Sequence, residues 1–240
     1  MIKLILTYDG TNYFGWQKTK TGPSIQEEIG KAVLRITGEE VSAEAASRTD
    51  RGVHARGQVV QFELKKSFIP EMLQRGLNAV LPKDIRVVSI EFANFHPTLD
   101  AIGKEYHYQI SIGPVQDPTL RYYSWHIHYP LDTKVINSAA KSLIGTHDFS
   151  AFANIKEKNP ICSLESIEFK DFFIIRGDRF LYKMVRNIVG TLVYVGCGKI
   201  AAYDIPKILE SKDRKLAGVT APALGLYLHE VQYSSKLNLP

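Results

Sequence analysis

The eleven residues Ser47–Gly57, SRTDRGVHARG, place one aspartate among three arginines. Arg48 and Arg51 lie on either side of Asp50, and Arg56 follows six residues after it. Neighbouring guanidinium groups favour the ionised form of a carboxyl group, and a carboxylate can act as a nucleophile, a base or an electrostatic group. A solvated turn whose aspartate only accepts backbone hydrogen bonds is the alternative, because structural ion pairs have the same composition.

This stretch resembles the G-R-T-D-A-G-V-H-A motif of the tRNA pseudouridine synthase A (TruA) family, although Ser47 replaces the usual Gly and Arg51 the usual Ala. Further segments resemble other landmarks of the family in the same order along the chain. They are Tyr8–Gly10, Tyr13–Gln17, Leu77–Pro82, Lys104–Tyr108, Met184–Gly190 and Ala221–Leu228. The landmarks cover nearly the whole chain.

The resemblance implies an isomerase that converts uridine to pseudouridine at positions 38 to 40 of the tRNA anticodon stem-loop. It implies that Asp50 is the nucleophile or base, with Arg186 as the partner that positions its carboxylate. Tyr106 would stack on the flipped base and could relay its C5 proton. Arg48 and Leu226 would contact the substrate. The reaction is redox-neutral, so no cofactor and no metal are expected, and the family works as a homodimer that binds tRNA across both subunits.

The residues themselves leave alternatives open. Two-residue alternation places Tyr106 and Tyr108 on one face of a strand, where Tyr106 is either a core residue or the aromatic wall of a pocket. Arg186 interrupts an apolar helix, either as a side chain that reaches solvent or as the partner of a buried carboxylate. Asp50 and His54 have a spacing seen in metal sites, but no further ligand lies nearby at a suitable spacing. We therefore expect His54 to order the turn by hydrogen bonding.

The chain of 240 residues has a net charge of +5 and a pI near 9.0, which favours an anionic partner. Its apolar fraction of 45% and charged fraction of 23% are typical of a globular protein. The run Lys212–Lys215 carries its own acid and is interpreted as a solvated face. The lysines and arginines that we expect to follow RNA phosphates are Lys18, Lys20, Arg48, Arg51, Arg56, Lys65, Lys66, Lys156, Lys158, Arg176 and Arg179.

Cys162 and Cys197 are the two cysteines, and neither belongs to a C-x-x-C pair. They are expected to be reduced or buried in a cytoplasmic protein. The apolar stretch before Asp9 is too short for a signal peptide, and no run approaches the roughly 18 apolar residues of a membrane span. Neither a dinucleotide-binding G-x-G-x-x-G motif nor a P-loop occurs.

Apolar alternation and helix caps predict an α+β fold. The predicted strands are Ile2–Thr7, Gln58–Leu64, Ile85–Phe92, Tyr106–Ile112, Tyr122–His128, Ser166–Ile175 with a turn inside it, and Leu226–Tyr233. The predicted helices run from the cap Ser24 to about Ile36, from Glu71 to about Ala79, from the cap Asp132 to a stop at Gly145, from about Phe180 to Tyr194, and from Asp204 onward.

Two units are expected, residues 1–103 with the Asp50 turn and residues 104–240 with Tyr106 and Arg186. Each alternates strands and helices in the manner of a ferredoxin-like (RRM-like) unit. The resemblance implies that the two share a central, mostly antiparallel sheet with a positively charged cleft between them.

Two other functions stay open at this point. One is a pseudouridine synthase for another RNA site, because target choice depends on how a basic surface fits the shape of the RNA. The other is a catalytically idle RNA-binding protein on the same scaffold. The joint presence of Asp50, Tyr106 and Arg186 argues against the idle protein, since RNA binding alone requires none of the three.

Overall fold

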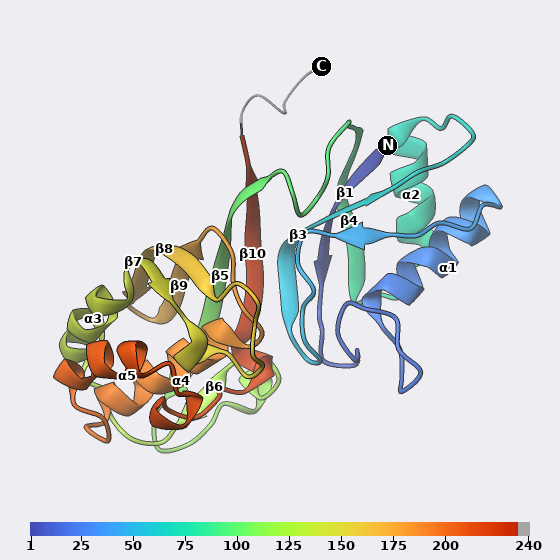
Figure 1. Ribbon diagram of the computed structural model, residues 1–240. Coiled ribbons are helices and arrows are strands. Elements are labelled where there is room, and N and C mark those ends of the chain that lie inside the picture. Colours follow the sequence, from blue (N-terminus) through green and yellow to red (C-terminus); the bar gives the residue numbers. More distant parts are fainter. Residues whose placement is uncertain (235–240) are drawn as a thin grey trace. The chain divides into compact units, whose positions relative to one another are not determined.

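The computed structural model describes residues 1–234, which divide into two compact units (Figure 1). Among the described residues, the first unit consists of Met1–Ile102 and Tyr227–Ser234, and the second is Gly103–Leu226. From the sequence we predict that the whole of 104–240 belongs to the second unit. Strand β10 (Leu226–Tyr233) is instead grouped with the first, because it pairs in parallel with β3 (His54–Phe62). The predicted α+β class is confirmed.

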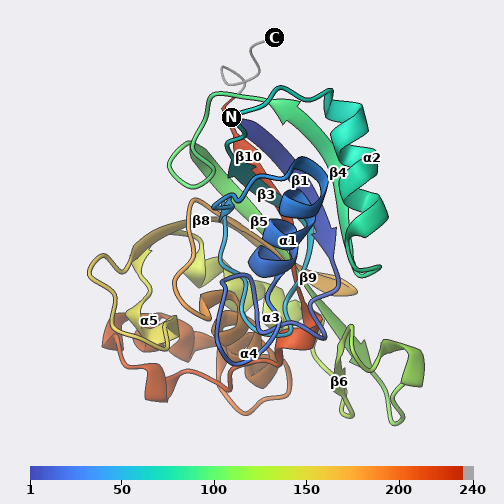
Figure 2. The ribbon, with the colours of Figure 1, turned by 90° about the vertical axis from the view of Figure 1, so that its right-hand side faces the viewer.

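In the first unit the strands follow the order β4-β1-β3-β10, with β2 beside β3. Strand β1 is antiparallel to both of its neighbours. Two helices, α1 and α2, lie on the same face of this sheet (Figures 1 and 2). The remaining bounds in this unit are β1 Ile2–Tyr8, β2 Glu44–Ala45, β4 Ile85–Phe92, α1 Ile25–Thr37 and α2 Pro70–Val80.

Helix α1 shows how closely the local sequence specifies an element. The Ser24 hydroxyl accepts the N–H of Glu27 at 3.3 Å, as the predicted capping box requires. Gly38 ends the helix with φ of 74°, a left-handed conformation that glycine adopts without strain. Between these caps, Ile25, Ile29 and neighbouring apolar residues are buried against the sheet.

In the second unit the strands follow the antiparallel order β5-β9-β8-β7, and β6 pairs in parallel with β5. The bounds are β5 Ala101–Ile112, β6 Trp125–Ile127, β7 Gly145–Asp148, β8 Ile161–Phe169, β9 Phe172–Gly177, α3 Thr133–Ala140, α4 Met184–Gly196 and α5 Ile205–Ser211. Short 3₁₀ helices are η1 Pro118–Leu120, η2 Lys141–Leu143, η3 Ser150–Phe152, η4 Ala202–Asp204, η5 Arg214–Leu216 and η6 Ala223–Gly225.

Several predicted boundaries are wrong, and tertiary contacts explain two of them. Helix α4 begins at Met184 and not near Phe180, because Lys183 is left-handed with φ of 61° and the Tyr182 carbonyl accepts the N–H of Asn154. Strand β3 begins at His54, four residues earlier than predicted, because β10 pairs with it there.

Other differences concern short elements. The strand predicted over Tyr122–His128 is only the three residues of β6, since residues 121–123 form a turn. Gly145 was expected to stop a helix, but that helix ends at Ala140, and Gly145 opens strand β7. None of the helices in the described part of the chain has both the length and the apolar content needed to span a bilayer.

Candidate active site

Asp50 lies in the turn that directly precedes strand β3 of the first unit. It is half-buried and follows the buried Thr49. The Asp50 carbonyl accepts the N–H of Val53 at 3.1 Å, and Gly52 has φ of 76°. The predicted turn is therefore present, and it closes before strand β3 begins.

The N-terminal landmarks hold this turn in place. The Tyr8 hydroxyl shares a hydrogen bond of 2.7 Å with the Thr49 hydroxyl. The Thr49 carbonyl accepts the N–H of Trp16 at 3.0 Å, and the Tyr13 carbonyl accepts the N–H of Gly52 at 3.3 Å. Segments that are more than 30 residues away along the chain thus fix the backbone on both sides of the aspartate.

Two glycines allow these segments to approach so closely. A Cβ at Gly10 would lie 1.9 Å from the carbonyl oxygen of Val53, and one at Gly15 would lie 2.6 Å from that of Thr49. Gly15 also has φ of 96°. A side chain at either position would push the N-terminal segment away from the turn.

His54 connects the turn to the same segment, which confirms the prediction that it orders the turn by hydrogen bonding. It is buried, and its Nδ1 lies 3.1 Å from the N–H of Gly10 and 3.1 Å from a carboxylate oxygen of Asp9. An unprotonated Nδ1 accepts from Gly10, whereas a protonated one donates to Asp9. The ring stacks on Tyr227 with centroids 4.6 Å apart.

Asp84, two residues after the landmark that ends at Pro82, supports the N-terminal segment. The Asp84 carbonyl accepts the N–H of Asp9 at 2.9 Å, and its carboxylate accepts the hydroxyl of Tyr13 at 2.6 Å. Burial and the bond to Asp84 raise the pKa of Tyr13 well above its ordinary value, so this hydroxyl stays a donor. The two N-terminal landmarks and Asp84 therefore form one hydrogen-bonded support for Asp50.

Ser47, the first departure from the family motif, is accommodated by Gln58. The Gln58 amide donates to the Ser47 carbonyl at 2.6 Å and accepts the Ser47 N–H at 3.2 Å. Among the described residues other than glycine, only Lys183 and Lys212 have a positive φ. Serine therefore fits here without backbone strain.

The arginines of the motif are exposed, and two of them contact aromatic rings. The Arg51 guanidinium carbon lies 4.1 Å from the centroid of Phe14, and that of Arg56 lies 5.4 Å from the centroid of Tyr227. Arg48, just before Thr49, is also exposed. The arginines thus present positive charge on the surface beside the turn.

In the second unit, Tyr106 and Tyr108 lie on one face of β5, as predicted, but their surroundings differ. Tyr108 is fully buried and donates to the Pro222 carbonyl at 2.7 Å, so it is a core residue. Tyr106 is 7% exposed, and its ring meets Phe180 edge to face with centroids 5.1 Å apart. Phe180 orients the Tyr106 ring.

Lys104 shares this strand face with Tyr106, and its chemistry was not predicted. Burial, with a smaller contribution from nearby Arg179, lowers the pKa of Lys104 to about 8. Arg179 lies two residues after Gly177, the β9 partner of Lys104. No local pattern indicates this shift, because the burial of Lys104 and its approach to Arg179 both depend on the fold.

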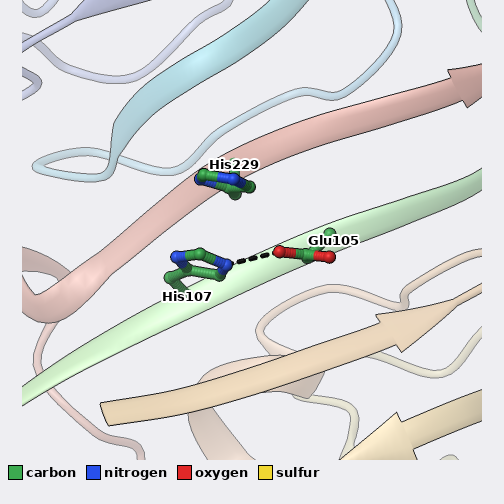
Figure 3. Close-up of side chains that lie close together, drawn as sticks. All are labelled: Glu105, His107 and His229. Carbon is green, nitrogen blue, oxygen red and sulfur yellow. Dashed lines mark hydrogen bonds and ion pairs between the residues drawn. The ribbon is translucent and has the colours of Figure 1, made fainter. Parts of the chain in front are cut away.

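The opposite face of β5 carries a buried ion cluster (Figure 3). Glu105 binds His107 through one carboxylate oxygen and Arg176 of β9 through the other. Burial alone raises the pKa of Glu105, but the bonds from His107 and Arg176 outweigh it, and the pKa lies below its ordinary value. Arg176 therefore forms a structural ion pair, and its contact with RNA phosphates stays a prediction.

Arg186 lies in the first turn of α4 and is half-buried. Its Nε donates to the Ala221 carbonyl at 2.7 Å, and its own carbonyl accepts the Ala221 N–H at 3.1 Å. Leu226 is buried at the start of β10. It follows Gly225, where a Cβ would lie 2.8 Å from the Tyr108 ring. Arg186 and the segment that leads to Leu226 are thus joined.

The structure gathers the predicted residues into three groups, each within one unit. Arg48, Asp50 and Arg51 share the turn in the first unit. Tyr106 stands with Phe180 in the second, where Arg186 is joined to Ala221. The predicted RNA contacts that are exposed, besides the three motif arginines, are Lys18, Lys20, Lys65, Lys66, Lys156 and Lys158.

Comparison with known proteins identifies the family. A family model described as tRNA pseudouridine synthase matches residues 4–97 and 139–234. The chain is 49% identical to tRNA pseudouridine synthase A 2 of Protochlamydia amoebophila (strain UWE25), over 97% of this chain and 94% of that protein. It is 46% identical to tRNA pseudouridine synthase A of Thermoanaerobacter sp. (strain X514), over 97% of this chain and 99% of that protein. The matched residues include every segment that supports Asp50 and the helix that carries Arg186, and the chain belongs to the tRNA pseudouridine synthase family.

Proposed function

We propose that this tRNA pseudouridine synthase modifies uridines at positions 38 to 40 of the anticodon stem-loop, with Asp50 as the catalytic residue. The observation that carries the proposal is the support of the Asp50 turn by the Tyr8–Trp16 segment. That support holds the half-buried Asp50 side chain on a rigid backbone. A catalytic group that reacts at one bond of its substrate needs such a fixed position.

The reaction breaks the bond between N1 of uracil and C1′ of the ribose, and forms a bond from C5 to the same carbon. The proton on C5 is lost and N1 is protonated, so atoms and electrons balance without a cofactor. Asp50 serves as the nucleophile or base at the glycosidic bond. Tyr106, oriented by Phe180, stacks on the flipped uracil and relays the C5 proton.

Arg186 is proposed as the partner of the Asp50 carboxylate. Its Nε is occupied by the Ala221 carbonyl, so the two terminal amino groups are the ones that bind a carboxylate. That bond also fixes the plane of the guanidinium. A carboxylate bound in this way is held in its charged form at a set orientation, while Leu226 contributes an apolar wall to the base pocket.

tRNA is proposed to bind through phosphate contacts from Lys18, Arg48 and Arg51, in keeping with the net charge of +5. These three residues would give the first unit a positively charged surface toward the RNA. A homodimer would extend that surface, and the cytoplasm, where tRNA is modified and where the free Cys162 and Cys197 stay reduced, is the proposed location.

Mapping the product tests this function. Purified protein is incubated with unmodified tRNA transcripts whose uridines carry tritium at C5, and pseudouridines are located chemically afterwards. We expect tritium release in proportion to pseudouridine at positions 38 to 40. Product at other positions would assign a different RNA site, and tRNA binding without release would indicate an idle RNA-binding protein.

The Arg51→Ala variant tests the RNA surface. Arg51 is exposed and stacks on Phe14, which keeps its guanidinium beside the turn without placing it in the chemistry. We expect weaker tRNA binding, and a slope of log K against log salt that is shallower by roughly 0.7 to 0.9 for the lost phosphate contact. The rate at saturating tRNA should be nearly unchanged.

Arg35, exposed in the last turn of α1, provides the matched control, and Arg35→Ala should leave both affinity and slope unchanged. An Arg51→Ala enzyme with normal affinity but a large loss in saturated rate would contradict the assignment. Arg51 would then act in the chemical step.

A further inference from the structure

In the run Lys212–Lys215, the side chains of Lys212, Asp213 and Lys215 are exposed, as predicted for a solvated face, but Arg214 is not. Lys212 pairs with Asp148 at 2.9 Å, and the Asp213 carboxylate accepts the N–H of Lys215 at 2.9 Å. Arg214 instead turns inward and is half-buried. A positively charged side chain that is partly removed from solvent needs hydrogen-bond partners in the protein.

Those partners are neutral oxygens on two segments. One terminal nitrogen of Arg214 donates to the Gly218 carbonyl at 2.8 Å. The other donates to the Asn187 side-chain oxygen and to the Thr220 hydroxyl, both at 2.9 Å. Thr220 in turn donates to the same Asn187 oxygen at 2.7 Å. Burial lowers the pKa of Arg214, yet arginine stays charged at any physiological pH.

Asn187 fixes this network to the body of the second unit. It is completely buried, and its amide nitrogen donates to the Phe152 carbonyl at 2.6 Å and to the Asn154 side chain at 2.7 Å. All four hydrogen-bonding positions of the Asn187 side chain are thereby used. Asn187 directly follows Arg186 in α4, so the network is rooted next to the proposed partner of Asp50.

The segment 217–221 also packs directly on α4. A Cβ at Gly190 would lie 1.7 Å from the Val219 carbonyl oxygen, so only glycine allows this approach. The N–H of Gly218 donates to the Thr191 hydroxyl at 2.9 Å. The last residue of the segment, Ala221, then receives the Nε–H of Arg186. The orientation of Arg186 therefore depends on where this segment lies.

We propose that Arg214 is a positioning residue for the reaction, which locks the segment 217–221 onto α4 and so orients the guanidinium of Arg186. The proposal rests on the proposed role of Arg186 as partner of the Asp50 carboxylate. Arginine is needed because one planar fork reaches Gly218, Asn187 and Thr220 at once. Lysine has a single side-chain nitrogen, which cannot reach Gly218 and the Asn187–Thr220 pair at the same time.

The Arg214→Lys variant tests this, because it keeps the charge and loses the fork. We expect the rate at saturating tRNA to fall about 10- to 100-fold, the loss typical of a reacting group misplaced by about an ångström. The KM for tRNA should change little, because Arg214 faces the protein. Thr220→Val, which removes one partner of the fork, should lower the same rate by a smaller factor.

A second readout does not depend on activity. In protein labelled with ¹⁵N-arginine, the Nε–H signal of Arg186 reports its bond to the Ala221 carbonyl. The Arg186→Lys protein lacks this signal, which identifies it among the signals of the other arginines. We expect it to exchange faster with solvent in Arg214→Lys than in the parent protein. Lys215→Gln, an exposed neighbour in the same run, is the matched control and should change neither rate nor signal.

A raised KM with an unchanged saturated rate would overturn the proposal and make Arg214 an RNA contact. An unchanged Arg186 signal in Arg214→Lys would overturn it as well, whatever the rate. Failure of the proposed function is recognised separately, because the parent protein would then form no pseudouridine at positions 38 to 40 while the effect on the Arg186 signal persisted.

Discussion

The Asp50→Asn variant is expected to lose pseudouridine formation by about 10,000-fold or more, the scale seen when a principal catalytic group is removed. Asparagine has the shape of aspartate but is neither a nucleophile nor a base. The turn itself should persist, because its backbone is held by Thr49, Tyr13 and Trp16 and not by the carboxylate alone. Tritium release from tRNA labelled at C5 of uridine measures the loss.

Affinity for tRNA should stay close to that of the parent protein in this variant, since binding depends on phosphate contacts from other residues. The thermal unfolding temperature provides a second control and should change little. Measurable pseudouridine formation by pure Asp50→Asn protein would remove Asp50 from the catalytic role. A collapse of the fold would show instead that the carboxylate is structural.

The Glu105→Gln variant is expected to lose about 3 kcal/mol of unfolding free energy, measured by urea denaturation at neutral pH. The Glu105 side chain is 7% exposed and accepts hydrogen bonds from His107 and Arg176. An amide in its place would turn its own N–H group toward one of these two donors, and that hydrogen bond would be lost. The loss should lie near the low end for a broken buried pair, because the Arg176 side chain is 34% exposed and can be hydrated.

The pH dependence of this effect follows from the lowered pKa of Glu105. Its carboxylate stabilises the fold above the unfolded-state pKa near 4.5, and this contribution is lost as the pH falls through the lower folded-state value. The difference between parent and variant should therefore be complete at neutral pH and shrink below about pH 4.5.

Glu168→Gln is the matched control, because Glu168 is exposed on β8 and lies 3.8 Å from Lys170. Its effect should stay within about 0.5 kcal/mol at every pH. An equal loss in both variants would mean that the buried ion cluster adds no stability beyond a surface pair.

Elements whose signals are local could be predicted from the sequence. Ser24 and Gly38 bound α1, and apolar alternation located Ile85–Phe92 and Leu226–Tyr233 with the observed limits. Caps and alternation act through neighbouring residues, so they can be recognised without knowing the fold. The family was likewise recognisable, because its motifs are short and contiguous.

Which charged side chains are buried could not be predicted, because it depends on contacts between distant parts of the chain. Arg214 and Asn187 are 27 residues apart, and Arg176 and Glu105 are 71 apart, so no local pattern joins either pair. The late start of α4 also depends on a distant contact, between Tyr182 and Asn154. A charge is buried only when the fold brings it partners that replace water, and those partners come from elsewhere in the chain.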